Sequence, residues 1–128
     1  MISIKILVIE GGPFFTAMLV RFIQQTDAGF VVDVRKGTLE SLLVDLDCWA
    51  PDVLLLDLDT PGLKNLSRIS QARKTQPEVI IIVMGIFDDV SYRALAVGNS
   101  ADDYLSKDDL PNLLFSTIQY HLSSKITV

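Results

Sequence analysis

Short hydrophobic runs alternate with amphipathic segments along the whole chain. Three of the runs are rich in Ile and Val without polar alternation, which is typical of strands covered on both faces of a sheet. The runs are Ile4–Ile9, Phe30–Val34, Val53–Leu56, Val79–Met84 and Tyr104–Leu105. The pattern therefore predicts five short strands, at least three of them inside a sheet.

Between and after the runs, hydrophobic residues recur at the three- and four-residue spacing of a helix. Pro13 and Pro111 suit first helical turns, while Thr38, Asp88 and one of Asp108 or Asp109 suit N-caps. The stripes are Phe15, Met18, Leu19 and Phe22; Leu39, Leu42, Leu43 and Leu46; Leu63, Leu66 and Ile69; Val90, Ala94 and Val97; and Leu110, Leu114, Ile118 and Leu122. Strand and helix thus alternate five times. Because parallel strands need crossover connections, we expect an α/β fold with a parallel sheet and helices on both faces.

Length and charge narrow the class of protein. The chain has 128 residues, 16 acidic and 11 basic, with a formal net charge of -5. This size fits one domain over residues 1–128, and the acidic balance argues against direct nucleic-acid binding. No hydrophobic run approaches the length of a membrane span, there is no signal-peptide pattern, and Cys48 is the only cysteine. We therefore expect a cytoplasmic domain.

Two charged residues follow predicted strands, at the carboxyl ends of the strands, where open parallel sheets bind ligands. Asp57 comes directly after Val53–Leu56, and Lys107 follows the fifth run. A carboxylate at this edge can act as a nucleophile toward phosphorus, and a lysine can contact the phosphoryl oxygens. Such chemistry uses a divalent cation, usually Mg²⁺, held by further oxygen ligands. Either residue alone could simply face solvent, but the pair favours a phosphoryl-transfer site.

With these residues in place, the whole chain resembles the receiver domains of two-component response regulators. The resemblance is strongest over 54–62, Leu-Leu-Leu-Asp-Leu-Asp-Thr-Pro-Gly, and 101–108, Ala-Asp-Asp-Tyr-Leu-Ser-Lys-Asp. It implies a flavodoxin-like, doubly wound sheet of order 2-1-3-4-5 with five helices. It also implies that a histidine kinase or phosphotransfer protein phosphorylates Asp57, that Lys107 contacts the phosphate, and that rotation of Tyr104 reports phosphorylation. Such a domain catalyses at most its own phosphorylation and dephosphorylation, and is not otherwise an enzyme.

The chain departs from this family at the metal and switch positions. The acidic pair after the first strand is Glu10-Gly11, so one expected carboxylate is missing. The resemblance assigns Mg²⁺ to Glu10, Asp57 and Asp59, and we expect weakened binding. The Asp59 carboxylate could replace the missing one, repel an incoming phosphate, or simply face solvent. The position at the end of the fourth strand, where the family has Ser or Thr, is Gly85, followed by Ile86 in place of a small residue.

Two function hypotheses follow from the match and its departures. The first is a phosphoacceptor that relays its phosphoryl state by a conformational change in bacterial signalling. The alternative is a pseudo-receiver, a protein-interaction module that acts without phosphorylation. By resemblance, the surface of the fourth helix, fifth strand and fifth helix would carry contacts with a second copy or an output partner. The kinase, the output and any domain after residue 128 are not identified by the sequence.

Other assignments fit the residues less well. Asp57 and Asp59 resemble the nucleophile motif of haloacid-dehalogenase phosphatases, but that motif follows a first strand. A flavodoxin needs a hydroxyl-rich phosphate loop, which the segment after Ile9 lacks. His121 lies in the last predicted helix and suits an ordinary helix position, Cys48 suits packing, and the acids at 102–103 suit solvated loops.

Overall fold

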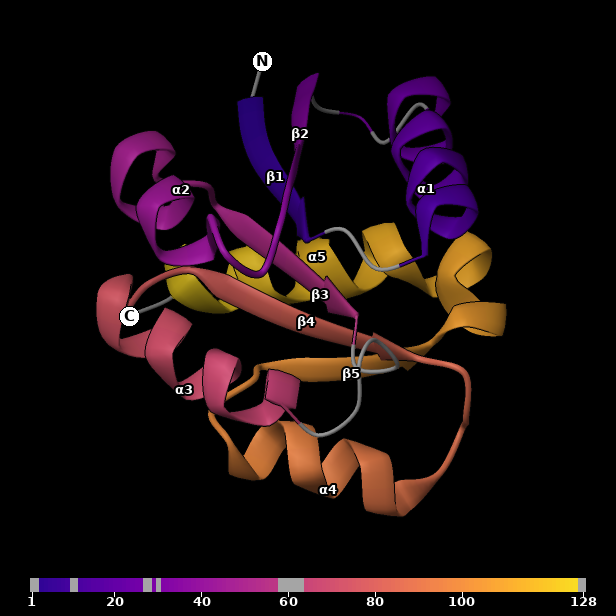
Figure 1. Cartoon of the computed structure of the whole chain (residues 1–128). Coiled ribbons are helices and arrows are strands. Elements are labelled where there is room, and N and C mark those ends of the chain that lie inside the picture. Colours follow the sequence, from indigo (N-terminus) through magenta and orange to yellow (C-terminus); the bar gives the residue numbers. More distant parts are fainter. Residues whose placement is uncertain (1–2, 10–11, 27–28, 30, 58–63, 127–128) are drawn as a thin grey trace.

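The computed structural model of the protein describes residues 3–9, 12–26, 29, 31–57 and 64–126. Its five strands form one parallel sheet in the order β2-β1-β3-β4-β5 (Figure 1). The strands are β1 Ser3–Ile9, β2 Val31–Gly37, β3 Val53–Asp57, β4 Ile80–Gly85 and β5 Asp103–Ser106. The predicted sheet and its order are therefore confirmed.

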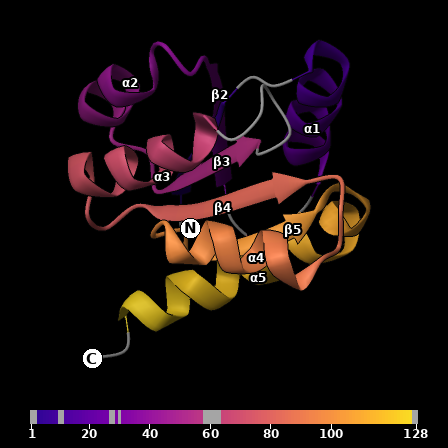
Figure 2. The ribbon, with the colours of Figure 1, turned by 60° about the horizontal axis from the view of Figure 1, so that its bottom comes forward.

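Five α-helices connect and cover these strands. They are α1 Pro13–Gln25, α2 Leu42–Trp49, α3 Lys64–Thr75, α4 Val90–Gly98 and α5 Leu110–Ile126, with a short 3-10 helix, η1 Lys107–Asp109, before the last. Helices α1 and α5 cover one face of the sheet, and α2, α3 and α4 cover the other (Figure 2). No helix in the described part of the chain is long and apolar enough to cross a membrane.

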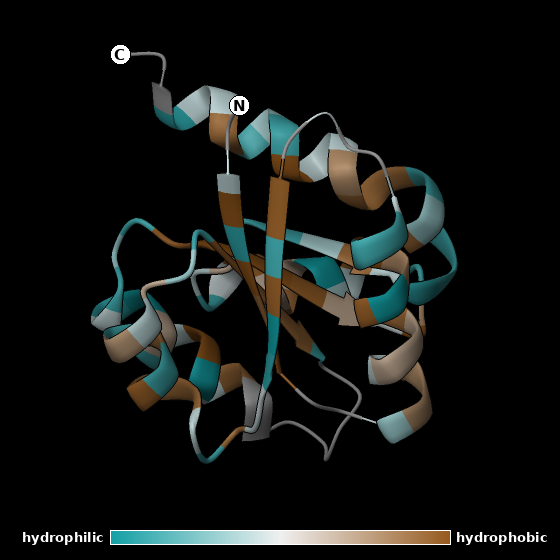
Figure 3. Ribbon diagram, turned by 90° about the horizontal axis from the view of Figure 1, so that it is seen from above, coloured by the Kyte–Doolittle hydropathy of each residue, from teal (hydrophilic) through white to brown (hydrophobic). Residues whose placement is uncertain are grey.

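Alternate residues of the inner strands supply the two hydrophobic cores. In β3, Leu54 and Leu56 face α2, α3 and α4, while Val53 and Leu55 face α1 and α5. The central strands are strongly hydrophobic, whereas the edge strand β2 alternates hydrophobic and hydrophilic residues (Figure 3). Strand β2 extends to Gly37, beyond its hydrophobic run, because it pairs with β1 along its whole length.

Some local predictions were wrong in ways that have physical causes. Helix α2 begins at Leu42, because Thr38 exchanges hydrogen bonds with Ser41 in a preceding turn instead of capping the helix. The N-cap of α4 is Asp89, not Asp88, and its carboxylate accepts the Ser91 N–H at 2.8 Å. Cys48 is exposed.

The predicted stripe of α4 is also not its packed face. Val90 is 83% exposed and Val97 47%, whereas Ala96 is fully buried. A short alanine packs against the sheet here, and it carries little hydrophobic signal in the sequence. Helix α4 therefore exposes hydrophobic side chains beside the polar Ser91 and Arg93.

Candidate functional site

Asp57 is the last residue of β3 and a buried carboxylate. All five residues of this strand are buried, and alternation along it directs Asp57 toward the same face as Val53 and Leu55, the face covered by α1 and α5. Its side chain is only 3% exposed. A charged group this deeply buried needs charged or hydrogen-bonding partners, because burial alone disfavours its ionised form.

Lys107 supplies such a partner from the next-but-one strand. Strand β5 ends at Ser106, and Lys107 begins the 3-10 helix that follows. Its Nζ lies 2.8 Å from Asp57 Oδ2, and its side chain is 19% exposed. The structure therefore brings together the two residues that the sequence selected, although 50 positions separate them.

The remaining metal ligands expected from the sequence, Glu10 and Asp59, lie outside the described residues, as does Gly11. Within the described ranges, no group of three or more His, Cys, Asp or Glu side chains is arranged to hold a metal ion. Asp57 has the chemistry of an Mg²⁺ ligand, since hard cations prefer carboxylate oxygen. Its Oδ2 is the oxygen that faces the Lys107 ammonium.

Gly85 and Tyr104 form a second contact at the same end of the sheet, on the opposite face. Tyr104 is 2% exposed and belongs to the core under α2, α3 and α4. A Cβ atom added to Gly85 would lie 2.1 Å from Tyr104 Oη and 2.9 Å from Cζ. The tyrosine ring thus occupies the volume in which any side chain at position 85 would have to begin.

Aromatic stacking and a hydrogen bond hold Tyr104 in this place. Its hydroxyl donates to the carbonyl oxygen of Phe87 at 2.6 Å. Its ring stacks on Tyr92 with centroids 6.4 Å apart, and Tyr92 stacks on Phe87 at 5.4 Å. The three rings link β5, the segment after β4 and helix α4, so the inward position of Tyr104 is supported from several elements.

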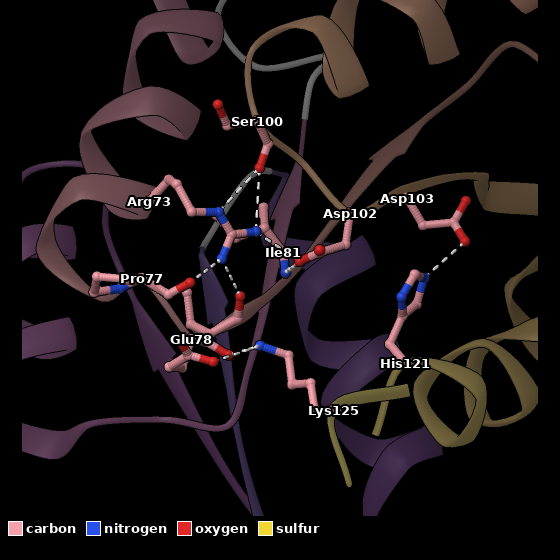
Figure 4. A network of polar contacts seen from close by, with 10 residues as sticks. Arg73, Pro77, Glu78, Ile81, Ser100, Asp102, Asp103, His121 and Lys125 are labelled. Carbon is pink, nitrogen blue, oxygen red and sulfur yellow. Dashed lines mark hydrogen bonds and ion pairs between the residues drawn. The ribbon is translucent and has the colours of Figure 1, made fainter. Parts of the chain in front are cut away.

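Two carboxylates that the sequence placed in solvated loops instead connect secondary-structure elements (Figure 4). Asp102 pairs with Arg73 at 2.6 Å and accepts the Ile81 N–H at 2.8 Å. Arg73 also donates to the carbonyl oxygens of Pro77, Val79 and Ser100. This network fixes α3 to the starts of β4 and β5. Only the fold reveals it, because the loop acids carry no distinctive spacing.

Asp103 makes the second connection, from β5 to α4 and α5. Its Oδ1 lies 2.6 Å from Arg93 NH1, and its Oδ2 lies 3.1 Å from His121 Nε2. Burial raises the pKa of Asp103, but hydrogen bonds from His121, the Tyr104 N–H and Arg93 outweigh it and leave the pKa below its ordinary value. His121 is therefore a contact between helix and strand, away from Asp57.

Comparisons with known proteins agree with this fold. The family described as response regulator receiver domain matches residues 6–119. A solved two-component response regulator of the LuxR family from Aurantimonas has a TM-score of 0.82 at 18% identity, covering 96% of this chain and 87% of that chain. At this identity the structural likeness concerns the fold alone.

Curated relatives match over most of this chain but only part of their own length. The chain is 28% identical over 127 residues to protein-glutamate methylesterase/protein-glutamine glutaminase 3 of Rhodospirillum rubrum, covering 96% of this chain and 33% of that protein. It is 32% identical over 106 residues to response regulator MprA of Mycobacterium ulcerans, covering 82% and 44%. The family match, the sheet order and the Asp57–Lys107 pair lead to one conclusion: this chain belongs to the response regulator receiver domain family.

Proposed function

We propose that the chain is a phosphoacceptor domain that takes a phosphoryl group onto Asp57. One observation carries the proposal: a 3% exposed carboxylate at the end of β3 lies 2.8 Å from the Lys107 ammonium. A histidine kinase or phosphotransfer protein is the proposed donor. One oxygen of Asp57 attacks phosphorus, the bond from phosphorus to the donor's imidazole nitrogen breaks, and that nitrogen keeps the electron pair.

In this proposal, Lys107 stabilises the phosphoryl oxygens, where negative charge increases during transfer. Asp57, Glu10 and Asp59 would hold Mg²⁺, which offsets the negative charges of the carboxylate and the phosphoryl group. Because Gly11 carries no carboxylate, we expect binding to need a higher Mg²⁺ concentration than a site with the full acidic pair.

The proposal is tested by incubating the protein with acetyl phosphate and Mg²⁺ and then measuring intact mass. We expect the mass of one phosphoryl group to be added to the protein and to be absent from Asp57→Asn. Asp88→Asn is the matched control, because Asp88 is exposed on the segment between β4 and α4. An unmodified protein, or equal modification of Asp57→Asn, would contradict phosphorylation at Asp57.

A second candidate function has one observation in its favour. Gly85 offers no hydroxyl to a phosphoryl group, and Tyr104 already fills the adjacent volume with its ring. This packing suits an interaction module whose surface is the same with and without phosphate. Under either function we place the partner or second copy on the surface of α4, β5 and α5. Exposed hydrophobic residues support that placement: Val90, Leu95, Val97, Leu113 and Tyr120.

A further inference from the structure

The Lys107 ammonium has an aromatic neighbour in addition to Asp57. Its Nζ lies 4.3 Å from the centroid of the Phe15 ring, on the ring face, and 2.8 Å from Asp57 Oδ2. A cation within about 6 Å of an aromatic centroid is attracted by the negative face of the ring. Lys107 is thus held by a carboxylate from β3 and by an aromatic ring from α1.

Helix packing fixes the position of the Phe15 ring. Phe15 lies in the first turn of α1, two residues after Pro13, and is itself partly buried against the core formed with α5. Leu19 and Ile23, further along the same helix, are 4% and 1% exposed. The ring therefore belongs to a packed helix face, and its location does not depend on a loop.

The Lys107 side chain borders an apolar groove. A groove of about 190 Å³ between α1 and the start of α5 is lined by Phe15, Met18, Leu19, Phe22, Lys107, Leu110 and Pro111. Among the described residues that line this groove, Lys107 alone carries a charge. Low-polarity walls strengthen both the ion pair and the cation–π attraction, because less water screens them.

We propose that Phe15 is a positioning residue that holds the Lys107 ammonium at the Asp57 carboxylate. This inference rests on the proposed phosphorylation of Asp57 for its functional effect, whereas the contact itself exists without phosphate. The ring and the carboxylate together restrict the direction of the ammonium at Asp57. Phe15 supplies this restraint without adding a negative charge that would repel the incoming phosphoryl group.

The neighbouring residue provides a matched control. Phe14 is 86% exposed and precedes Phe15 in the same helical turn. The variants are Phe15→Leu, Phe15→Tyr and Phe14→Leu, together with pentafluorophenylalanine at position 15, which keeps the ring shape while reversing the charge of its face. Circular dichroism and urea unfolding confirm that each variant is folded.

Two measurements are made on each variant. The first is the NMR shift of the Lys107 methylene protons beside Nζ, without phosphodonor, which reports the ring above them. The second is the initial rate of phosphorylation by acetyl phosphate with Mg²⁺, followed by intact mass. We expect Phe15→Leu and the pentafluoro variant to lower this rate roughly three- to tenfold. Phe15→Tyr keeps an aromatic ring and should keep the rate of the wild-type protein. Phe14→Leu should also have the wild-type rate.

The two measurements separate failure of the inference from failure of the proposed function. If the unmodified protein takes no phosphate, the proposed function fails. The inference is then decided by the NMR shift of the Lys107 methylene protons. A changed shift in Phe15→Leu and in the pentafluoro variant, with an unchanged shift in Phe14→Leu, supports it. If the protein is phosphorylated and the pentafluoro variant matches it in rate and Lys107 shift, Phe15 is only a packing residue and the inference is overturned.

Discussion

Two groups of side chains meet the carboxyl end of the sheet from opposite faces, and they are built differently. One group, which we call the Asp57 side, consists of Asp57, Lys107 and Phe15. It lies beneath α1 and α5 and combines an ion pair with an aromatic ring. The other group, which we call the Tyr104 side, consists of Gly85, Phe87, Tyr92 and Tyr104. It lies beneath α4 and combines stacked aromatic rings with a glycine.

Under the proposed function, this difference in construction predicts that the two sides behave differently when Asp57 is phosphorylated. If Asp57 takes a phosphoryl group as proposed, the charged groups on the Asp57 side would exchange partners. On the Tyr104 side, a ring that is 2% exposed fills its volume and bonds to Phe87. Rearranging that side requires breaking close packing, which is costly in a dense core. Three stability measurements test this contrast.

The largest expected effect is on the Asp57 side. Without Mg²⁺, Lys107→Met leaves the Asp57 carboxylate buried without this cation, so we expect the free energy of unfolding to fall by about 3 kcal/mol. The double variant Asp57→Asn/Lys107→Met should recover most of that loss, because neither member of the pair is then charged. Urea unfolding in EDTA measures both, with the exposed Lys74→Met as control. A double variant no more stable than Lys107→Met would contradict a mutual pair.

A smaller loss is expected on the Tyr104 side. Gly85→Ala places a Cβ 2.1 Å from Tyr104 Oη and should destabilise the protein by about 2 kcal/mol through overpacking. Gly98→Ala is the control: no atom lies within 4 Å of its added Cβ, so it should be neutral or stabilising. In Tyr104→Leu, the same Gly85→Ala change should cost little in urea unfolding. Equal costs in both backgrounds would mean that Tyr104 does not occupy this volume.

The smallest effect is expected at Asp103, the residue before Tyr104 in β5. Because the folded-state pKa of Asp103 lies below its ordinary value of 3.8, its ionised form contributes stability above that pH. This contribution is lost as pH falls through the folded-state pKa. We expect Asp103→Asn to cost about 1.5 kcal/mol at pH 7, and less at pH 3, in urea titrations. A cost that stays constant or grows toward acid pH would contradict this assignment.

Much of this architecture could be predicted from the sequence because burial on both faces produces uninterrupted hydrophobic runs. Strand β3 is fully buried and was predicted almost to the residue, with Asp57 at its end. The stripe of α5 was also confirmed, since Leu110, Leu114 and Ile118 are at most 3% exposed. Hydrophobic pattern failed in α4, where the buried residue is the small Ala96.

The contacts between distant residues were less accessible to sequence reasoning. Gly85 could be recognised as lacking a hydroxyl, but its contact with Tyr104 depends on the register of β4 with β5, in which Val83 pairs with Tyr104. Likewise, Phe15 belongs to an ordinary helical stripe, and only the packing of α1 places its ring beside Lys107. Pattern alone does not specify which residues meet across a sheet.

The most direct test of the contrast is an NMR titration with beryllofluoride and Mg²⁺, which reads both sides in one sample. We predict that Lys107 and Phe15 resonances shift and that Asp57→Asn abolishes these shifts. The nuclear Overhauser contact between the Tyr104 ring and the Gly85 α-protons should persist throughout. Loss of this contact on addition would instead indicate the rotation of Tyr104 that the family resemblance implies, and would contradict an account in which Tyr104 stays in place. No shift at Lys107 would contradict reaction at Asp57.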